Sequence, residues 1–208
     1  MLFNALLKTF SPYLKTLSAY RATMRSNVRA AWTGTWDTFE FYEAMSDSIT
    51  NGLTAAWNEG LESVKATDED VTPEEKRWLL DVIANETAVI DGFADFIDEH
   101  SKKNGGLLRD CFDRLELWFS RYDQVVDLGA LAGGKSTDNY QWEFGDTIKH
   151  CDTCSALDGV IASKKDWDAS GLRPRNPPNE RLECGGWQCD CRLNPTTEPA
   201  TEGGIPNV

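Results

Sequence analysis

The spacing of the cysteines constrains the fold of this chain more than any other feature. Five of its six cysteines lie between residues 151 and 191, in two groups: HCDTC at 150–154 and LECGGWQCDC at 182–191. A C-x2-C turn places two thiolates on one side of a tight loop, which matches half of a tetrahedral zinc shell, and the second group can supply the other half. We therefore expect a small module that folds around a zinc ion, with the candidate ligands Cys151, Cys154, Cys184, Cys189 and Cys191.

Four of these five cysteines are enough for one ion. Residues one apart in an extended strand point to opposite faces, so Cys189 and Cys191 are less easily used together than Cys184 with either of them. The segment between the two groups is too polar to pack by itself, so the ion would supply folding free energy and be structural. We favour the set Cys151, Cys154, Cys184 and Cys189, with Cys191 as a close substitute and His150 as a weaker candidate.

Disulfides are the main alternative for these cysteines. The cluster is odd in number and the N-terminus lacks the pattern of a secretory signal, so we expect a reducing, intracellular compartment instead. A thioredoxin-like redox pair would require the C-x2-C to open a helix after a strand of βαβ type, which 140–150 does not resemble. Cys111 lies apart from the cluster on the apolar face of a predicted helix, where a buried structural thiol is the expected role.

The sequence contains few features that are typical of an enzyme. A catalytic zinc keeps an open position and commonly uses histidine or carboxylate ligands, whereas the chain has only His100 and His150 and no H-E-x-x-H. The sequence also contains no P-loop, no dinucleotide-binding glycine motif and no G-x-S-x-G. We predict that the protein is not an enzyme, and keep a zinc hydrolase or nuclease as a competing hypothesis.

The sequence before the cysteines has helical periodicity. Apolar residues recur at helical spacing over 5–31, where Thr33-Gly34 then ends the pattern, and over 37–65, where Asn51-Gly52 and Gly60 weaken it. The segment TPEE at 72–75 forms a capping box with proline at the first helical position, and predicts a third helix that runs toward the stop signal Asn-Gly-Gly at 104–106. These patterns predict a helical N-terminal region.

A fourth helix is predicted over 107–128, followed by a glycine-rich linker at 129–136. The predicted fold is therefore mainly α: about four helices, then a small cysteine-rich module of α+β or loop structure, then a disordered tail. The expected parts are a basic N-terminal helical segment (1–36), a helical domain (37–132), a zinc module (137–193) and a flexible tail (194–208).

Charge divides the chain unevenly. Residues 1–36 contain five basic residues and no Asp or Glu, whereas the remainder carries 16 basic and 34 acidic residues. This contrast predicts that the basic segment meets an acidic partner, which can be nucleic acid, another protein or the acidic remainder of this chain. Apolar runs are short and interrupted by charges, so no membrane span is expected.

Several residues around the cysteines form a longer pattern: Trp142, Gly145-Asp146-Thr147, Cys151-x2-Cys154-x2-Leu157-x-Gly159, a proline-rich stretch from Pro174 to Pro178, and Cys189-Asp190-Cys191-x-Leu193. This pattern resembles the C-terminal signature of tailed-phage minor head proteins, namely the phage Mu F-like head morphogenesis proteins, also grouped with the minor head proteins of phage SPP1. The resemblance covers about 55 residues, with a weaker echo at Ala56-Trp57-x2-Gly60. Cys184 stands where the family often has His-Pro, and Asp190 replaces an arginine.

The resemblance implies a structural role in a virion. Members of that family act in head assembly or genome delivery at the portal vertex or capsid interior, so the expected partners are portal, capsid or scaffold proteins, with several copies per virion and assembly in the host cytoplasm. DNA contact is expected only through residues 1–36, because the acidic remainder repels DNA. The alternatives are a zinc-knuckle protein that binds DNA or regulates, and a neck or tail component of the virion.

Overall fold

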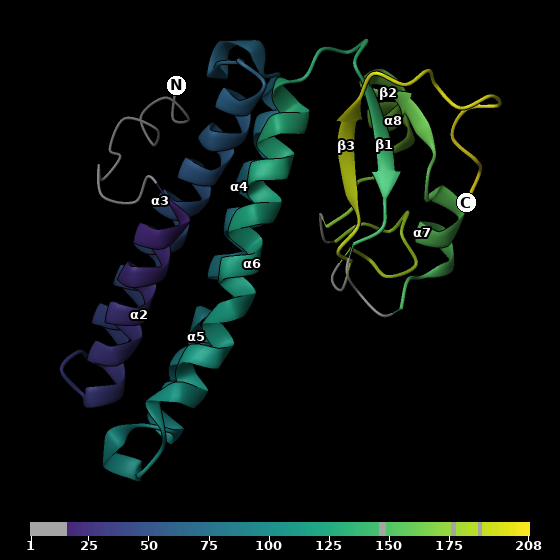
Figure 1. Cartoon of the computed structure of the whole chain (residues 1–208). Coiled ribbons are helices and arrows are strands. Elements are labelled where there is room, and N and C mark those ends of the chain that lie inside the picture. The colour runs from purple at the N-terminus through teal and green to yellow at the C-terminus, as the bar shows by residue number, and fades with distance from the viewer. Residues whose placement is uncertain (1–15, 146–148, 176–177, 187–188) are drawn as a thin grey trace.

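A long helical arm and a small cysteine-rich module make up the described part of the protein (Figure 1). The computed structural model describes residues 16–145, 149–175, 178–186 and 189–208. Two short 3-10 turns, η2 (Asp68–Asp70) and η3 (Lys102–Asn104), lie between helices of the arm. Within the described residues no helix is long and apolar enough to cross a membrane. The arm contains α2 (Leu17–Thr33), α3 (Thr38–Ser63), α4 (Pro73–Thr87), α5 (Ile90–Glu99) and α6 (Leu108–Gly133).

The mainly α prediction is confirmed, and most predicted helix ends are where local chemistry places them. Helix α2 ends at Gly34, whose φ of 73° is left-handed, and α4 begins with the capping box of Thr72 and Glu75. The expected helix over 5–31 is described only from Leu17, and its first part lies outside the described residues.

Two predicted boundaries are wrong. The third helix does not continue from Pro73 to the glycines but is divided into α4 and α5 at Ala88 and Val89, where the Thr87 hydroxyl bonds to the carbonyls of Ile83 and Ala84. Such bonding to the preceding turn competes with the helical ladder. The linker expected at 129–136 begins too early, because α6 continues to Gly133.

Two glycines at the contact between α3 and α6 suggest breaks in these helices when only the sequence is considered. A Cβ at Gly60 would lie 2.1 Å from the carbonyl oxygen of Val126, and one at Gly129 would lie 2.3 Å from that of Trp57. Both residues therefore allow the two long helices to touch backbone to backbone. In sequence the same residues resemble a helix breaker and the start of a linker.

The module, defined here as residues 139–208, is built on a three-stranded antiparallel sheet. Strand β1 (Asn139–Glu143) lies between β2 (Ile161–Ser163) and β3 (Arg192–Thr196), and the short helices α7 (Asp152–Leu157) and α8 (Lys164–Ser170) flank the sheet. Trp142 and Trp167 are buried with ring centroids 5.7 Å apart. The segment between the cysteine groups thus contributes to the core, contrary to the expectation that it is too polar to pack.

The boundary of the predicted tail also needs correction. Residues 194–196 belong to β3 and pair with β1, so the tail does not begin at 194. Farther on, the backbone N–H of Thr201 donates to the carbonyl of Ile161, and the Thr201 hydroxyl accepts from the Ile161 N–H. These bonds hold part of the predicted tail against β2.

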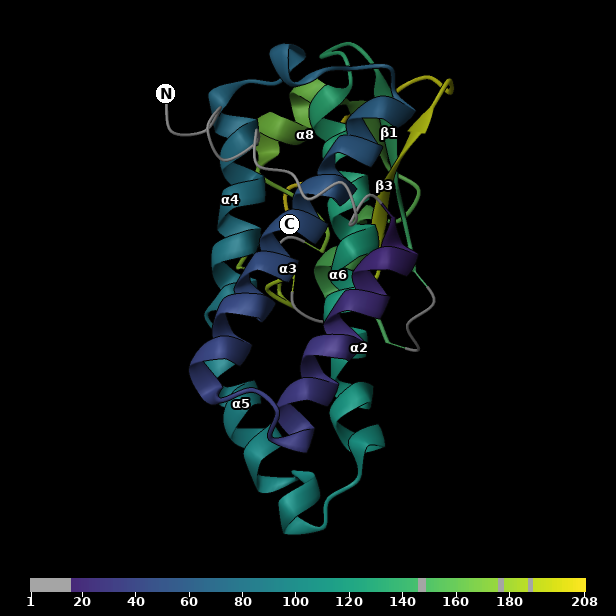
Figure 2. The same ribbon diagram turned by 90° about the vertical axis from the view of Figure 1, so that its left-hand side faces the viewer.

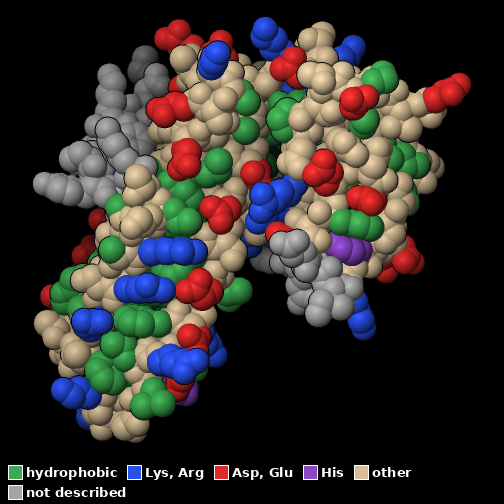
Figure 3. Space-filling model, viewed as in Figure 1, with side chains coloured by type: hydrophobic (Ala, Val, Ile, Leu, Met, Phe, Trp, Pro, Cys, Tyr) green, Lys and Arg blue, Asp and Glu red, His purple; other side chains and the backbone are tan. Residues whose placement is uncertain are grey.

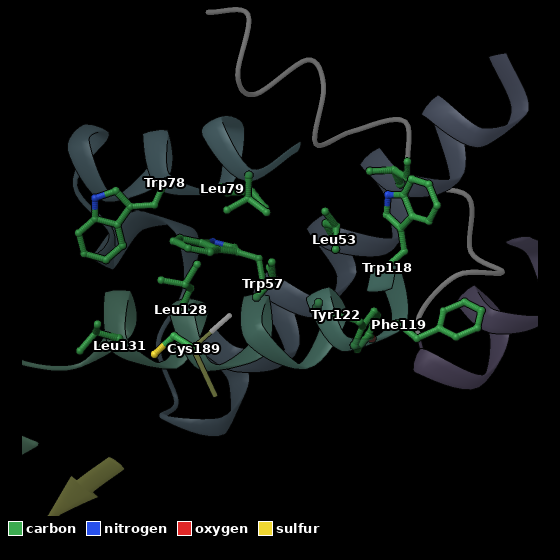
Figure 4. Close-up of a cluster of buried hydrophobic side chains, with 14 of the residues drawn as sticks. Leu53, Trp57, Trp78, Leu79, Trp118, Phe119, Tyr122, Leu128, Leu131 and Cys189 are labelled. Carbon is green, nitrogen blue, oxygen red and sulfur yellow. The ribbon is translucent and has the colours of Figure 1, made fainter. Parts of the chain in front are cut away.

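The arm and the module share one hydrophobic core. The module lies beside the half of the arm where α4 begins (Figures 1 and 2). Buried side chains form a continuous cluster from Phe119 and Trp57 in the arm, through Leu128 on α6, to Cys189 in the module (Figure 4). The side of the module that faces the arm therefore includes part of its cysteine cluster.

Charged side chains complete the contact between the two parts. Lys164 at the start of α8 pairs with Glu75 of α4, and both side chains are less than 10% exposed. The Arg173 guanidinium lies 3.8 Å from the centre of the Trp78 ring, and the Arg175 guanidinium bonds to Asp127 of α6 at 3.0 Å. The module supplies the cations of this contact and the arm supplies the acids and the aromatic ring.

Candidate metal centre

The module brings all five clustered cysteines to one place. Strand β1 ends and strand β3 begins at the same end of the sheet, because Glu143 pairs with Arg192. Cys191 directly precedes β3, and Cys151 caps the N-terminus of α7, which follows β1 in the chain. The predicted convergence of the two cysteine groups therefore agrees with the topology of the sheet.

Two hydrogen bonds hold the second cysteine group against α7. The backbone N–H of Asp152 donates to the Glu183 carboxylate at 2.8 Å, and the N–H of Glu183 donates to the Thr153 hydroxyl at 3.3 Å. Since Glu183 adjoins Cys184, this exchange places the Cys184 thiol beside those of the C-x2-C turn. The left-handed Gly185 and Gly186 then turn the chain toward Cys189.

The cysteine sulfurs form two overlapping groups of three. In one group Cys151, Cys154 and Cys184 have their sulfurs within 4.8 Å of one another, and in the other Cys154, Cys189 and Cys191 do. The Cys154 and Cys189 sulfurs are 3.8 Å apart. This distance matches the edge, about 3.8 Å, of a tetrahedron of metal–thiolate bonds of about 2.3 Å, and far exceeds the about 2.05 Å of a disulfide.

A cavity of about 210 Å³ lies among these side chains. It is lined by all five cysteines together with Lys149 and His150. The sulfurs of Cys154, Cys189 and Cys191 belong to residues that are at most 8% exposed, whereas Cys151 and Cys184 are half-buried. The cluster can therefore hold a metal ion with most of its ligands shielded from water.

Backbone N–H groups point at the sulfurs, as expected for thiolates. The N–H of Cys154 donates to the Cys151 sulfur at 3.4 Å. Burial raises the pKa of Cys151, but this bond and those from Cys184 outweigh burial, so the pKa of the Cys151 thiol is lowered. Burial raises the pKa of Cys184 to about 11, although the Gly186 N–H works in the opposite direction.

Cys191 has the strongest preference for the thiolate form. Hydrogen bonds from the thiols of Cys154 and Cys189 lower its pKa to about 3, and the Gly145 N–H and the Trp142 indole act in the same direction. The same contacts raise the pKa of Cys154 far above that of a free thiol. The thiols thus share protons as a group, and a cation that replaces these protons stabilises all of them.

Two residues of the predicted pattern shape the site without offering a ligand. A Cβ at Gly145 would lie 2.0 Å from the carbonyl oxygen of Asp190, so only glycine allows the chain just after β1 to pass so close to the Cys189–Cys191 segment. The Trp142 side chain is completely buried, and its indole N–H has no hydrogen-bond partner among the residues that the structure describes.

His150 lies at the edge of the cluster, next to one cysteine. Its Nδ1 is 3.8 Å from the Cys191 sulfur, and its ring stacks on Phe144 with centroids 3.8 Å apart. Cys111 is buried on α6, as expected, and takes no part in the cluster. All six cysteines, each of them among the described residues, are free thiols.

Arg175 was missed by the sequence analysis. It is a buried residue with a left-handed φ of 57°, and its side chain bonds to Asp127 and lies 3.4 Å from the Asp190 carboxylate. Nothing in the local sequence distinguishes it from a surface arginine, because its partners are far away in the chain.

No protein-family description, no curated protein and no solved structure matched the chain in the comparisons. What defines the site is therefore its own geometry: five converging thiols in a small α+β module that is attached to a helical arm.

Proposed function

We propose that this chain is a structural protein of a tailed-phage virion, of the minor head type, and that its module is held together by zinc. The observation that carries the proposal is the convergence of Cys151, Cys154, Cys184, Cys189 and Cys191 on one cavity. Those cysteines, with their flanking residues, are the pattern on which the resemblance to the phage Mu F-like proteins rests.

The flanking residues of that pattern have structural roles, which supports reading it as one folded unit. Trp142 and Leu157 are completely buried, and Leu193 pairs with Trp142 across β1 and β3. Gly159 has a left-handed φ of 80° and donates its N–H to the Trp142 carbonyl at 2.8 Å. A family signature built from such positions preserves a fold rather than a reaction.

The proposed metal is zinc in a structural role. The donors are thiolates that are mostly buried, and His150 is the one histidine that lines the described part of the cavity. Sulfur-rich shells of this kind are typical of closed structural zinc sites, whereas catalytic sites keep an exchangeable position. Bound here, the ion would supply folding free energy, and we propose no enzymatic activity.

The arm offers the surface for partners. Arg21 and Arg25 of α2 lie over the Phe119 ring, at 5.2 and 5.5 Å from its centre, and Arg25 also pairs with Glu116 at 3.4 Å. Basic and apolar side chains alternate over this part of the arm (Figure 3). Such a surface suits an acidic portal, capsid or scaffold protein, and its charge also allows contact with packaged DNA.

Two measurements test the proposal. Mass spectrometry of purified particles and assembly intermediates of the phage that encodes the chain should find it in a few copies per particle, and its absence from particles of every stage would overturn the virion assignment. X-ray absorption at the zinc edge should find a shell dominated by sulfur. A shell of nitrogen and oxygen donors with bound water would point to a hydrolase instead.

A further inference from the structure

Cys154 occupies a central position in the cysteine cluster. Its sulfur belongs to both groups, close to Cys151 and Cys184 on one side and to Cys189 and Cys191 on the other. The largest sets of described donors that lie mutually within 4.8 Å contain three sulfurs each, and Cys154 is their common member. A single tetrahedral ion has four ligands that are all neighbours of one another. The cluster is instead arranged as two partial sites that share one sulfur.

We propose that the centre binds two zinc ions and that the Cys154 thiolate bridges them. This inference rests on the proposed metal site and concerns the number of ions that the site takes. One ion is held from the side of Cys151 and Cys184, and the other from the side of Cys191.

The number of donors agrees with two ions. Two tetrahedral ions require eight coordination positions, and the cavity offers six donors: five sulfurs and the Nδ1 of His150, which is 3.8 Å from the Cys191 sulfur. If two of the six donors each bind both ions, all eight coordination positions are filled. Cys154 is one, and Cys189 is the second, because its sulfur is 3.8 Å from that of Cys154, as two tetrahedra sharing an edge require.

Each donor then has a defined place. Cys151 and Cys184 complete the first ion, and Cys191 and His150 complete the second. Cys189 lies with the second group, so its sulfur moves toward the first group when the ions bind. Each cysteine that is still protonated loses its proton to solvent when it binds an ion, and no electrons are transferred.

Charge also favours two ions. One divalent ion with four thiolates has a net charge of −2 and leaves the fifth thiol unused, whereas two divalent ions with five thiolates and a neutral histidine have a net charge of −1. Cys154, Cys189 and Cys191 are at most 8% exposed, and excess charge is costly where water is excluded. The second ion therefore reduces the buried charge and uses the fifth cysteine.

Native mass spectrometry of the full chain tests the number of ions. The reduced protein is first freed of metal and then titrated with Zn²⁺ alone. Two zinc ions per chain, bound at similar affinity, are the expected result. One ion per chain would overturn the two-ion centre and leave the proposed metal site intact, and no bound ion would overturn both.

The bridge itself is tested with ¹¹³Cd²⁺ in place of zinc. Two cadmium resonances are expected, and the β-protons of Cys154 should show scalar coupling to both of them. A cysteine that couples to two metals is a direct sign of a bridging thiolate. Two resonances without a shared Cys154 would contradict the proposed bridge.

Substitutions provide a matched control. Cys191→Ser and His150→Ala remove donors of the second ion only, so each variant should bind one zinc per chain instead of two. Cys111→Ala changes a buried thiol of α6 outside the cluster and should keep both ions. If the variants of the cluster fail to fold, the zinc and cadmium measurements on the unchanged chain decide the question.

Discussion

The helical arm and the cysteine-rich module reach a folded state by different means. Helices α3 and α6, each of 26 residues, bury long rows of apolar side chains against each other and against α2. The module has strands of three to five residues and two helices of six and seven residues. Such short elements bury little apolar surface of their own, and the cysteine cluster lies among them. Burial of apolar surface stabilises the arm, whereas we expect bonds to a metal to stabilise the module.

We expect the module to depend on two supports outside its own sheet. One is the candidate metal centre, and the other is the arm, where Lys164 contacts Glu75, Arg173 contacts Trp78 and Arg175 contacts Asp127. Because the Arg175 side chain bonds to Asp127 of α6 and lies 3.4 Å from the carboxylate of Asp190, between Cys189 and Cys191, both supports meet at one residue.

Removal of the metal should have the largest effect on the stability of the module relative to that of the arm. A structural zinc site of this type is worth on the order of 10 kcal/mol, so a chelator should unfold the module and leave the arm helical. Hydrogen exchange should then show lost protection over 139–196 and unchanged protection over 38–63. Equal protection of the module with and without metal would mean that its apolar core suffices.

Breaking the buried ion pair between Lys164 of the module and Glu75 of the arm should have the next largest effect on stability. Lys164→Met leaves the Glu75 carboxylate buried without its main partner and should lower the free energy of unfolding by about 3–5 kcal/mol. Adding Glu75→Gln removes that charge while keeping a side chain that can accept from Thr72, so the double variant should recover part of the loss. Urea unfolding measures both; a double variant no better than the single one would argue against an unpaired charge as the cause.

The third prediction concerns the close contact between helices α3 and α6 at Gly60. Gly60→Ala places a methyl group against the Val126 carbonyl and should destabilise the arm by about 1–3 kcal/mol. Gly92 of α5 is the matched control, since a Cβ there meets nothing within 4 Å, and Gly92→Ala should instead stabilise by about 0.5–1 kcal/mol. Thermal unfolding that shifts both variants in the same direction would show that the contact is not responsible.

The pH dependence of the Lys164–Glu75 pair should give the smallest effect. Burial raises the pKa of Glu75, but its bonds to Lys164 and Thr72 outweigh burial, so its folded pKa is below the usual 4.5. Its contribution to stability is therefore complete above pH 4.5 and is lost as the pH falls through the folded value. Burial lowers the pKa of Lys164, but its carboxylate partners outweigh burial and raise the folded pKa above 10.5.

The contribution of Lys164 is accordingly complete below pH 10.5 and is lost as the pH rises further. Urea unfolding across this range should show the two losses at opposite ends in the unchanged chain. In the Lys164→Met, Glu75→Gln variant both should shrink, and undiminished losses there would assign the pH dependence to other groups.

The sequence allowed much of the arm and the list of cysteines to be predicted. Caps at Thr72 and Gly34 are local signals, because each is made by side chains and backbone within a few residues, so they could be read before the fold was known. The continuation of α6 past Gly129 could not be read in this way, because it depends on the backbone of Trp57, which is 72 residues away in the chain.

By itself, the sequence determined the helical class of the arm and the identity of the five cysteines, since periodicity and residue type carry both. Only the tertiary structure decided that Cys154 lies between two groups of sulfurs and that the module packs on the arm through Lys164 and Arg175. The physical reason is that these arrangements depend on the register of β1 with β3 and on ion pairs between distant segments. No local pattern encodes such contacts.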